Sequence, residues 1–308
     1  MAAAIKAPKF KLSFLTPKFW PVWLGVFLLY IITWLPLPVI RFIGGGAGKL
    51  IAKIVPKRVR VAKRNLELWN PSLSESEVQA LLKENVRRTG MALFETAMGW
   101  WWPDWRVKKA IEIEGAEHVE AAIASGHGVF GMALHNMNLE FACRGIGYFH
   151  PSIAFYRKHN NPLVDYLQYH GRNRSNKYMI DKRNAKALLM ALEDKELCLY
   201  LPDQDYGPKQ SVFVPFGGVA ETATTTATLM FIRRSTSVPM IITSQYTARG
   251  YKIKIYPPLT HLGDMDDIAA LTELNTHIDK AIKEQPESYL WMHKRFKTRP
   301  SKDTPSLY

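Results

Sequence analysis

The sequence has few cysteines, and the signatures of several enzyme classes are absent from it. Its 308 residues include only two cysteines, Cys143 and Cys198, which excludes a disulfide framework and indicates a reducing compartment. No Cys-x2-Cys pair occurs and the nine histidines fall into no zinc spacing, so we expect no metal. The Gly-x-Ser-x-Gly sequence is missing too, which argues against a serine hydrolase.

Acidic residues are also in short supply. The chain has 41 Lys and Arg residues against 27 Asp and Glu residues, which gives a formal net charge of +14. Such a surface attracts phosphate groups, whether on nucleic acid, on lipid headgroups or on an acidic carrier protein. With 47% apolar and 22% charged residues the chain is not disordered, and its length allows one large or two modest domains.

Charge is missing altogether from residues 19–40, which are mostly apolar. A run of about 22 such residues is long enough to cross a hydrocarbon core of roughly 30 Å, so we expect residues 1–42 to anchor the chain in a membrane. Pro36 and Pro38 favour a variant in which the helix breaks and enters the bilayer without crossing it. A buried core helix is the remaining alternative.

The glycine-rich segment that follows lacks two features of a phosphate-binding loop. Ile43 stands where the Gly-x4-Gly-Lys-[Ser/Thr] motif needs its first glycine, and Leu50 stands where it needs a hydroxyl group. We therefore interpret these glycines as a site of close helix packing or a bend at the membrane surface. Further on, Ser74 and Glu77 match a capping box that begins another helix. Residues 43–110 are thus expected to form a membrane-proximal helical region.

From Ile111 onward, apolar runs typical of strands alternate with helical patterns. This alternation predicts an α/β fold with a central, mainly parallel sheet that is flanked by helices. Because no linker interrupts this part, residues 111–308 are expected to form one catalytic domain. The expected strands are 111–114, 128–134, 152–157, 177–180, 197–201, 238–244 and an edge strand at 251–256. The expected helices are 116–125, 161–169, 185–192, 222–233 and 267–283.

One of these strands ends at a histidine. The apolar run before His135 reads as a buried strand, and the residues after it look like the first turns of a helix. The carboxyl edge of a parallel sheet is where α/β proteins place their chemistry. His135 can act as a base near neutral pH, and Glu140 can hold its other ring nitrogen if His135 lies in the turn before the helix. The simpler alternative makes His135 a helix cap and Glu140 a solvated charge.

Two further strands are expected to end in polar residues at the same edge. Arg157 closes one of them and can bind a phosphate with both arms of its guanidinium group. Asp203 follows the other, and its turn can place backbone amides around an oxyanion. A structural salt bridge or turn explains each residue alone, but their convergence on one edge favours a binding role. Other polar residues close by in sequence are Gln204, Asp205, Arg172, Arg174 and Lys177.

Together these motifs resemble those of a known family. The His-x4-Glu spacing, the strand ending in Arg157 and the block Leu201-Pro-Asp-Gln-Asp-Tyr-Gly-Pro208 are similar to the membrane glycerolipid acyltransferases and, more narrowly, to the late acyltransferases of lipid A biosynthesis. The C-terminal run Trp291-Met-His-Lys-Arg-Phe-Lys-Thr-Arg-Pro300 is most similar to the lauroyltransferase branch. The palmitoleoyltransferases resemble it nearly as well, and the myristoyltransferases less so.

This resemblance implies a glycerolipid-acyltransferase-like fold and the transfer of a fatty acyl chain, most readily lauroyl, from acyl carrier protein. The acceptor would be a hydroxyl on an acyl chain of a Kdo2-lipid IVA-type precursor. His135 would deprotonate that hydroxyl and Glu140 would orient the imidazole, with acyl carrier protein as co-substrate and no cofactor. The residues expected to bind substrate are Arg157, Asp203, Gln204, Asp205, Arg174 and Lys177.

The resemblance also implies a location at the bacterial inner membrane, with the catalytic domain facing the cytoplasm. Membrane phospholipid would then be a further partner, and nucleic acid would not be one. Two alternatives of other classes stay open from the residues alone. One is a basic module that binds a membrane surface without catalysis, and the other is a lipid hydrolase, because a His–Glu pair can equally activate water.

Overall fold

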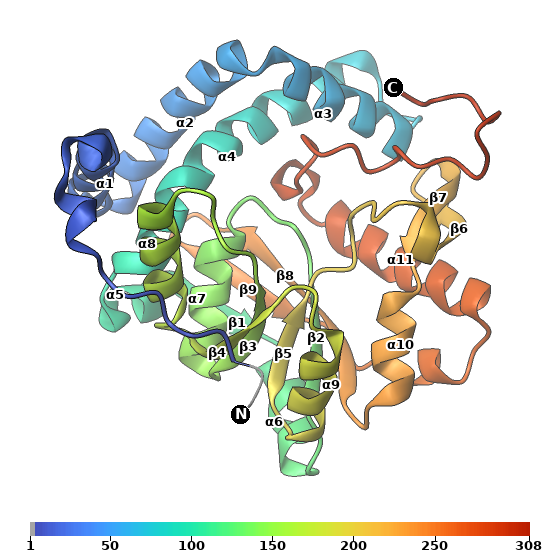
Figure 1. Ribbon diagram of the computed structural model, residues 1–308. Helices are drawn as coiled ribbons and strands as arrows, with labels where there is room; N and C mark the ends of the chain where they lie inside the picture. The colour runs from blue at the N-terminus through green and yellow to red at the C-terminus, as the bar shows by residue number, and fades with distance from the viewer. Residues whose placement is uncertain (1–3) are drawn as a thin grey trace.

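The computed structural model describes residues 4–308, in which a seven-stranded sheet carries helices on both faces and the N-terminal helices pack along one side (Figure 1). The helices are α1 (Trp20–Thr33), α2 (Leu37–Ile54), α3 (Pro56–Trp69), α4 (Glu75–Trp101), α5 (Asp104–Ala110), α6 (Ala116–Ala124), α7 (Leu139–Phe149), α8 (Pro162–Arg172), α9 (Ala185–Glu193), α10 (Ala227–Arg234) and α11 (Asp267–Lys283). The strands are β1 (Ile111–Glu114), β2 (Val129–Ala133), β3 (Ser152–Tyr156), β4 (Asn176–Asp181), β5 (Leu197–Tyr200), β6 (Ser211–Phe216), β7 (Val219–Thr225), β8 (Val238–Tyr246) and β9 (Tyr251–Ile255).

The large sheet has the strand order β1-β9-β8-β2-β5-β3-β4. All neighbouring strands run parallel except β8 and β9, which form an antiparallel hairpin. The predicted mainly parallel α/β sheet is therefore confirmed. The prediction that residues 251–256 form an edge strand is wrong, because β1 pairs with the free side of β9 and becomes the edge itself.

A second, two-stranded sheet pairs β6 with β7. The helix predicted from residue 222 begins only at Ala227, and the threonines before it belong to β7 instead. Branching at Cβ favours an extended backbone, which is why this threonine-rich segment continues the strand.

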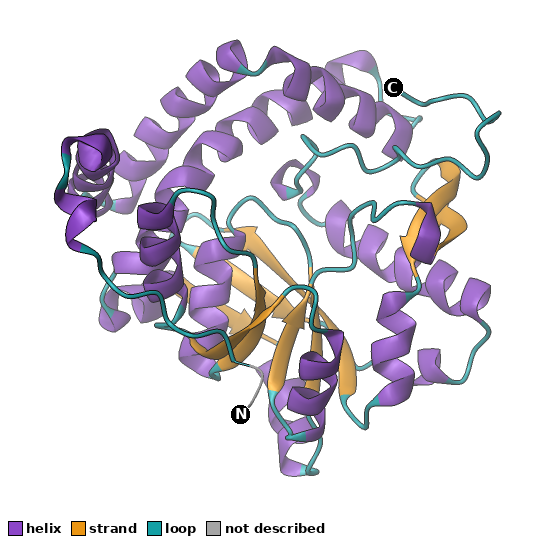
Figure 2. Cartoon of the chain, in the orientation of Figure 1, coloured by secondary structure: helices purple, strands orange, loops and turns teal. Residues whose placement is uncertain are grey.

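Helices cover both faces of the large sheet, as Figure 2 shows in purple around the orange strands. On one face Phe130, Met132 and Tyr200 pack into a core with α9, α10 and α11. On the other face Val129 and Leu199 pack against α6 and α7. Neighbouring residues of a strand thus enter different cores, as the alternation of side chains along a strand requires.

The charge-free run at the N-terminus forms two helices instead of one. α1 has 14 residues and ends at Thr33, so it spans about 21 Å at 1.5 Å per residue. The Thr33 carbonyl accepts hydrogen bonds from the Trp102 indole at 2.6 Å and from Arg106 at 2.8 Å, and Pro36 lacks the amide that would continue the helix. The unbroken helix through residues 19–40 is therefore wrong, and the alternative in which the helix breaks near Pro36 and Pro38 is the one the structure has. Among the helices described between residues 4 and 308, none is both long and apolar enough to cross a membrane.

Gly44, Gly45 and Gly48 of α2 lie against α4, as the interpretation of these glycines as a helix-packing site predicts. A Cβ atom on Gly48 would lie 2.3 Å from the carbonyl oxygen of Val86, and one on Gly90 would lie 2.1 Å from that of Gly44. Such distances leave no space for any side chain at these crossing points. The predicted capping box at the start of α4 is also confirmed, since the Ser74 amide donates to the Glu77 carboxylate at 2.8 Å.

Candidate active site

His135 lies two residues beyond the end of β2, at the carboxyl edge of the sheet. Its loop is held from the C-terminal side of the chain, because the amide of Leu290 donates to the His135 carbonyl at 2.9 Å. The next residue, Asn136, forms a β-bridge with Tyr289 and donates from its side chain to the carbonyl of Ser244, at the end of β8. The histidine therefore sits on a loop that is fixed on two sides.

The partner of His135 is Asp203, which follows β5, the strand next to β2. The Asp203 carboxylate lies 2.6 Å from Nδ1 of His135 and also accepts the His135 amide at 2.8 Å. The Asp203 side chain is fully buried, whereas 21% of the His135 side chain is exposed. Burial alone would raise the pKa of Asp203, but the imidazole and the two hydrogen bonds from His135 keep that pKa below its usual value.

This geometry defines what the pair can do. A charged Asp203 accepts the proton on Nδ1, so the lone pair of His135 is on Nε2 and the ring keeps one orientation. A buried carboxylate also stabilises the imidazolium that forms when Nε2 takes up a proton. The Tyr289 hydroxyl donates to the main-chain oxygen of Asp203 at 2.8 Å and fixes the turn itself. The site is thus arranged as an oriented general base.

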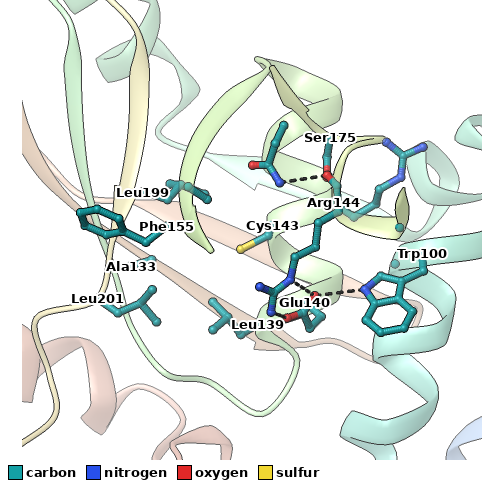
Figure 3. A pocket seen from close by; sticks show the side chains of 15 residues that line it. Trp100, Ala133, Leu139, Glu140, Cys143, Arg144, Phe155, Ser175, Leu199 and Leu201 are labelled. Carbon is teal, nitrogen blue, oxygen red and sulfur yellow. Dashed lines mark hydrogen bonds and ion pairs between the residues drawn. The ribbon is translucent and has the colours of Figure 1, made fainter. Parts of the chain in front are cut away.

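The expected contact between His135 and Glu140 is not formed. α7 begins at Leu139, three residues later than predicted, because Asn138 hydrogen-bonds Ser244 at 2.6 Å and holds the loop against β8. Glu140 in the first turn of α7 instead pairs with Arg172 at the end of α8, and it accepts a hydrogen bond from the Trp100 indole at 3.2 Å (Figure 3).

Glu140 and Arg172 are both half-buried. Burial opposes the charge on Arg172, but the Glu140 carboxylate outweighs it and raises the pKa of Arg172 above its usual value. The pair stands at an apolar cavity of about 90 Å³ between α7, α8 and the ends of β2, β3 and β5 (Figure 3). Its apolar lining includes Ala133, Leu199 and Leu201.

Arg157 lies where the sequence predicted it, directly after β3 at the carboxyl edge. With Lys158, His159 and Arg172 it lines an open hollow of about 410 Å³. Within residues 4–308 no carboxylate lines this hollow. Arg172 lines both the hollow and the apolar cavity, so its guanidinium group lies between an anion-attracting surface and an apolar space.

Other residues expected to bind substrate have structural partners instead. Lys177 is the second residue of β4, hence at the amino edge of the sheet, and it pairs with Glu196. Arg174 donates to the Trp100 carbonyl at 2.9 Å. Asp205 accepts from the amide and hydroxyl of Thr298 at 2.6 and 2.8 Å, which ties its loop to the C-terminal segment.

These contacts correct the expectation that Arg174 and Lys177 add charge at the His135 edge. Strand direction is the reason, because the chain reaches the opposite edge before β4 begins. Gln204, in contrast, lies beside Asp203 with a partly exposed side chain.

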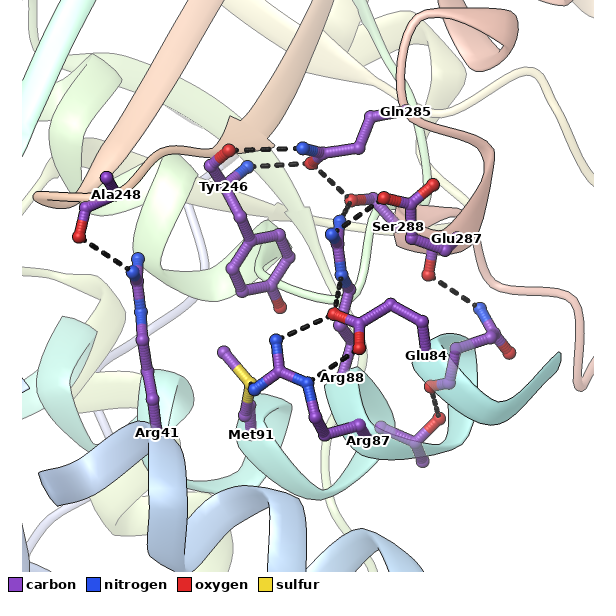
Figure 4. Close-up of polar contacts among 12 residues, drawn as sticks. Arg41, Glu84, Arg87, Arg88, Met91, Tyr246, Ala248, Gln285, Glu287 and Ser288 are labelled. Atoms are coloured by element: carbon purple, nitrogen blue, oxygen red, sulfur yellow. Dashed lines mark hydrogen bonds and ion pairs between the residues drawn. The ribbon is translucent and has the colours of Figure 1, made fainter. Parts of the chain in front are cut away.

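A buried polar network behind the His135 loop was not predicted from the sequence. Arg88 of α4 contacts Ser288 and also Glu287 at 2.8 Å (Figure 4). The Ser288 carbonyl accepts the amide of Met137 at 2.7 Å. The network therefore connects α4 to the segment after His135. The sequence shows the long helical pattern of α4 and the C-terminal signature, but neither indicates that the two regions are joined by this network.

Glu95 is a second buried group on α4. It is 2% exposed and accepts hydrogen bonds from the hydroxyls of Tyr246 and Tyr251, both at 2.8 Å. Burial raises its pKa to about 7, although the two hydroxyls and the nearby Arg41 and Arg88 favour the charged form.

The sequence is similar over most of its length to one family of known proteins. Residues 7–298 match the family described as bacterial lipid A biosynthesis acyltransferase. The chain is 40% identical to the lipid A biosynthesis lauroyltransferase of Escherichia coli (strain K12) over 98% of its own length and 99% of the relative. It is 39% identical to the lipid A biosynthesis palmitoleoyltransferase of the same organism, over 97% of its own length and 98% of the relative. Among solved structures, the crystal structure of the 1-acyl-sn-glycerophosphate (LPA) acyltransferase PlsC from Thermotoga maritima is 12% identical, over 81% of this chain and 97% of that one. Its TM-score of 0.39 is too low to assign a fold.

Proposed function

The chain belongs to the bacterial lipid A biosynthesis acyltransferase family, and on that premise we propose that it transfers a lauroyl chain from acyl carrier protein to a Kdo-modified lipid A precursor. The acceptor group is a hydroxyl on an acyl chain already present. The observation that carries the proposal is the oriented His135–Asp203 pair, which lies at the edge of the sheet that also bounds an apolar cavity. Lauroyl is the proposed chain, and palmitoleoyl and myristoyl are the alternatives.

In the proposed reaction, Nε2 of His135 takes the proton from the acceptor hydroxyl while the oxygen attacks the thioester carbonyl. Asp203 holds Nδ1 and stabilises the imidazolium. The tetrahedral intermediate then collapses, the carbon–sulfur bond breaks, and the imidazolium returns its proton to the leaving thiolate. One ester forms as one thioester is lost, so no covalent enzyme intermediate and no cofactor is required.

The Glu140–Arg172 pair has a different proposed role from the one that the His-x4-Glu spacing suggested. Glu140 fixes the guanidinium group of Arg172 at the boundary between the apolar cavity and the basic hollow. There Arg172 can donate to the polar end of an acyl group whose chain enters the cavity. Glu140 is thus proposed as a positioning residue for Arg172.

The acceptor is proposed to place a phosphate in the basic hollow. Arg157 and Lys158 are exposed there, and within the described chain neither takes part in an ion pair. The planar fork of Arg157 matches two phosphate oxygens. Gln204, next to Asp203, is proposed to contact substrate from the opposite side.

Membrane anchoring is proposed to come from the surface of α1 and α2. Large apolar side chains on these helices are exposed, among them Trp20 and Leu24 at 60%, Phe27 at 59% and Phe42 at 84%. Exposed apolar surface of this extent is costly in water and favourable at the boundary of a bilayer. The catalytic site would then face the cytoplasm at the inner membrane, where acyl carrier protein can reach it.

A defined transfer assay tests this proposal. Purified protein in detergent would receive lauroyl-acyl carrier protein and a tetra-acylated, Kdo-bearing lipid A precursor, and the products would be separated by mass. We expect an acceptor that carries one additional lauroyl group. Release of free fatty acid at the same rate with and without the acceptor would instead indicate a hydrolase, because the His135–Asp203 pair can activate water as well.

A further inference from the structure

A groove on the opposite face of the sheet from the apolar cavity is not used by the proposed reaction. Its volume is about 460 Å³, and it lies between the end of β5 and the starts of α9 and α10, which cover the same face of the sheet (Figure 1). Tyr200 and Phe231 form its inner wall. Both belong to the core on that face, whereas Leu199, one residue before Tyr200, belongs to the core on the cavity side.

The rim of this groove is positively charged. Lys182 and Arg183 directly follow β4, and both side chains are exposed. Of the residues described from 4 to 308, no acidic one lines the groove, and neither cation belongs to an ion pair. Thr226 and Gln210 add polar side chains to the lining. The groove therefore suits a ligand with an anion at one end and a flexible chain of mixed polarity behind it.

The groove and the apolar cavity meet at the carboxyl edge of the sheet. Phe155 lines both of them. The Tyr206 hydroxyl in the groove donates to the carbonyl of Leu201 at 2.6 Å, and Leu201 lines the cavity. Two residues later, Asp203 holds His135. A linear ligand that passes from groove to cavity would thus cross the edge beside the proposed base.

We propose that this groove binds the phosphopantetheine arm of the acyl donor, with its phosphate against Lys182 and Arg183. The inference rests on the proposed function, in which the donor is acyl carrier protein. The arm has a phosphate at one end, two amides along its length and the thioester at the other end. That order matches the cationic rim, the polar and aromatic walls and the crossing point near His135, from which the acyl chain enters the cavity.

The test compares 4′-phosphopantetheine with pantetheine as inhibitors of transfer from acyl carrier protein. In the wild-type protein we expect the phosphorylated compound to inhibit at about tenfold lower concentration, because charge-assisted hydrogen bonds from Lys182 and Arg183 would stabilise the bound phosphate. In Lys182→Ser/Arg183→Ser the two compounds should inhibit equally. The Michaelis constant for acyl carrier protein should rise by a similar factor, while that for the lipid acceptor stays unchanged.

A matched control removes two positive charges from α9 and α10, the helices beside the groove, at positions that do not line it. Lys186 on α9 and Arg234 on α10 are exposed and do not line it. Lys186→Ser/Arg234→Ser should keep the wild-type preference for the phosphorylated inhibitor, and thermal unfolding should confirm that both double variants are folded.

Three results would overturn the inference. They are equal inhibition by the two compounds in the wild type, a preference for phosphate that survives in Lys182→Ser/Arg183→Ser, and a change confined to the acceptor, which would assign the groove to the lipid instead. A wild-type protein that uses no acyl carrier protein at all would contradict the proposed function itself, and that outcome is visible before any variant is made.

Discussion

At the scale of single residues, His135 has two acidic residues that could serve as its partner, and the structure joins it to Asp203. Replacing Asp203 with Asn keeps the shape of the side chain but removes the charge that stabilises the imidazolium. We expect Asp203→Asn to lower turnover by a factor on the order of 10²–10⁴, the range over which positioned acid–base groups act. Steady-state turnover at saturating donor and acceptor measures this.

Glu140→Gln serves as the comparison, because it weakens the pairing with Arg172 and leaves the histidine untouched. We expect Glu140→Gln mainly to raise the Michaelis constant for an acyl substrate. Equal losses of turnover in both variants, with unchanged Michaelis constants, would contradict the assignment of Asp203 as the partner of His135.

Glu95 gives a second prediction at this scale. Its pKa of about 7 in the folded chain lies above that of an unfolded glutamate, so the folded chain binds the proton more tightly. The resulting contribution to stability is complete at low pH and is lost as the pH rises through about 7. We expect the free energy of unfolding of the wild type to fall by an amount on the order of 3 kcal/mol as the pH rises to about 7, and that of Glu95→Gln to fall much less. Thermal unfolding at a series of pH values measures this.

The exposed Glu120 on α6 provides the control for this experiment. Glu120→Gln should keep the pH dependence of the wild type. If Glu95→Gln also kept it, Glu95 would not be the group responsible.

Whether a contact in the site could be predicted from the sequence depends on how far apart its two residues lie along the chain. The strand that ends at His135, and the arrival of Arg157 and Asp203 at the same edge, follow from the alternation of strands and helices. The pairing of His135 with Asp203 does not, because the two are 68 residues apart and meet only since β5 lies next to β2. The nearer Glu140 fits the spacing, but the loop before α7 turns it toward Arg172.

At the scale of elements, the crossing of α2 and α4 depends on glycine. Gly48 faces the Val86 carbonyl and leaves no space for a Cβ atom. Gly46 lies half a turn away on the same helix, and a Cβ atom on Gly46 would have nothing within 4 Å. We expect Gly48→Ala to lower the free energy of unfolding by roughly 1–3 kcal/mol, because the helices must move apart. Gly46→Ala should leave stability unchanged or raise it by up to about 1 kcal/mol, since alanine favours a helix.

Thermal or denaturant unfolding in detergent measures both variants. Equal effects of the two substitutions would mean that helix propensity, and not packing against α4, decides the stability of this region.

For the fold, the sequence predicts which segments form strands and helices but not how the strands are ordered in the sheet. Each strand of the large sheet was predicted from its apolar pattern, yet the position of β9 inside the sheet was not, because periodicity carries no information about strand order. The charge-free run at residues 19–40 forms two helices, as Pro36 and Pro38 favoured, and α1 ends as early as Thr33 because Trp102 and Arg106 bind the Thr33 carbonyl. Such long-range hydrogen bonds have no local signal.

At the scale of the whole molecule, an exposed apolar surface on α1 and α2 accompanies a net charge of +14. We expect Leu24→Ser/Phe27→Ser to weaken binding to anionic lipid vesicles at least tenfold, because each side chain contributes roughly 1.5–3 kcal/mol when it leaves water. Co-sedimentation with vesicles measures this. Met190 and Ile268 are similarly exposed, on α9 and α11, and Met190→Ser/Ile268→Ser should bind as the wild type does. Equal binding by all three proteins would contradict an anchor on α1.

The central claim is that this chain acylates a lipid A precursor with His135 as the base. Mass spectrometry of lipid A from cells that lack their own late acyltransferases tests it most directly, with expression of the wild type or of His135→Ala. The account predicts that the wild type adds one acyl chain to the precursor, whose mass also identifies that chain, and that folded, membrane-bound His135→Ala leaves the precursor unchanged. An unmodified precursor with the wild type, or the same acylated product with both proteins, would contradict it.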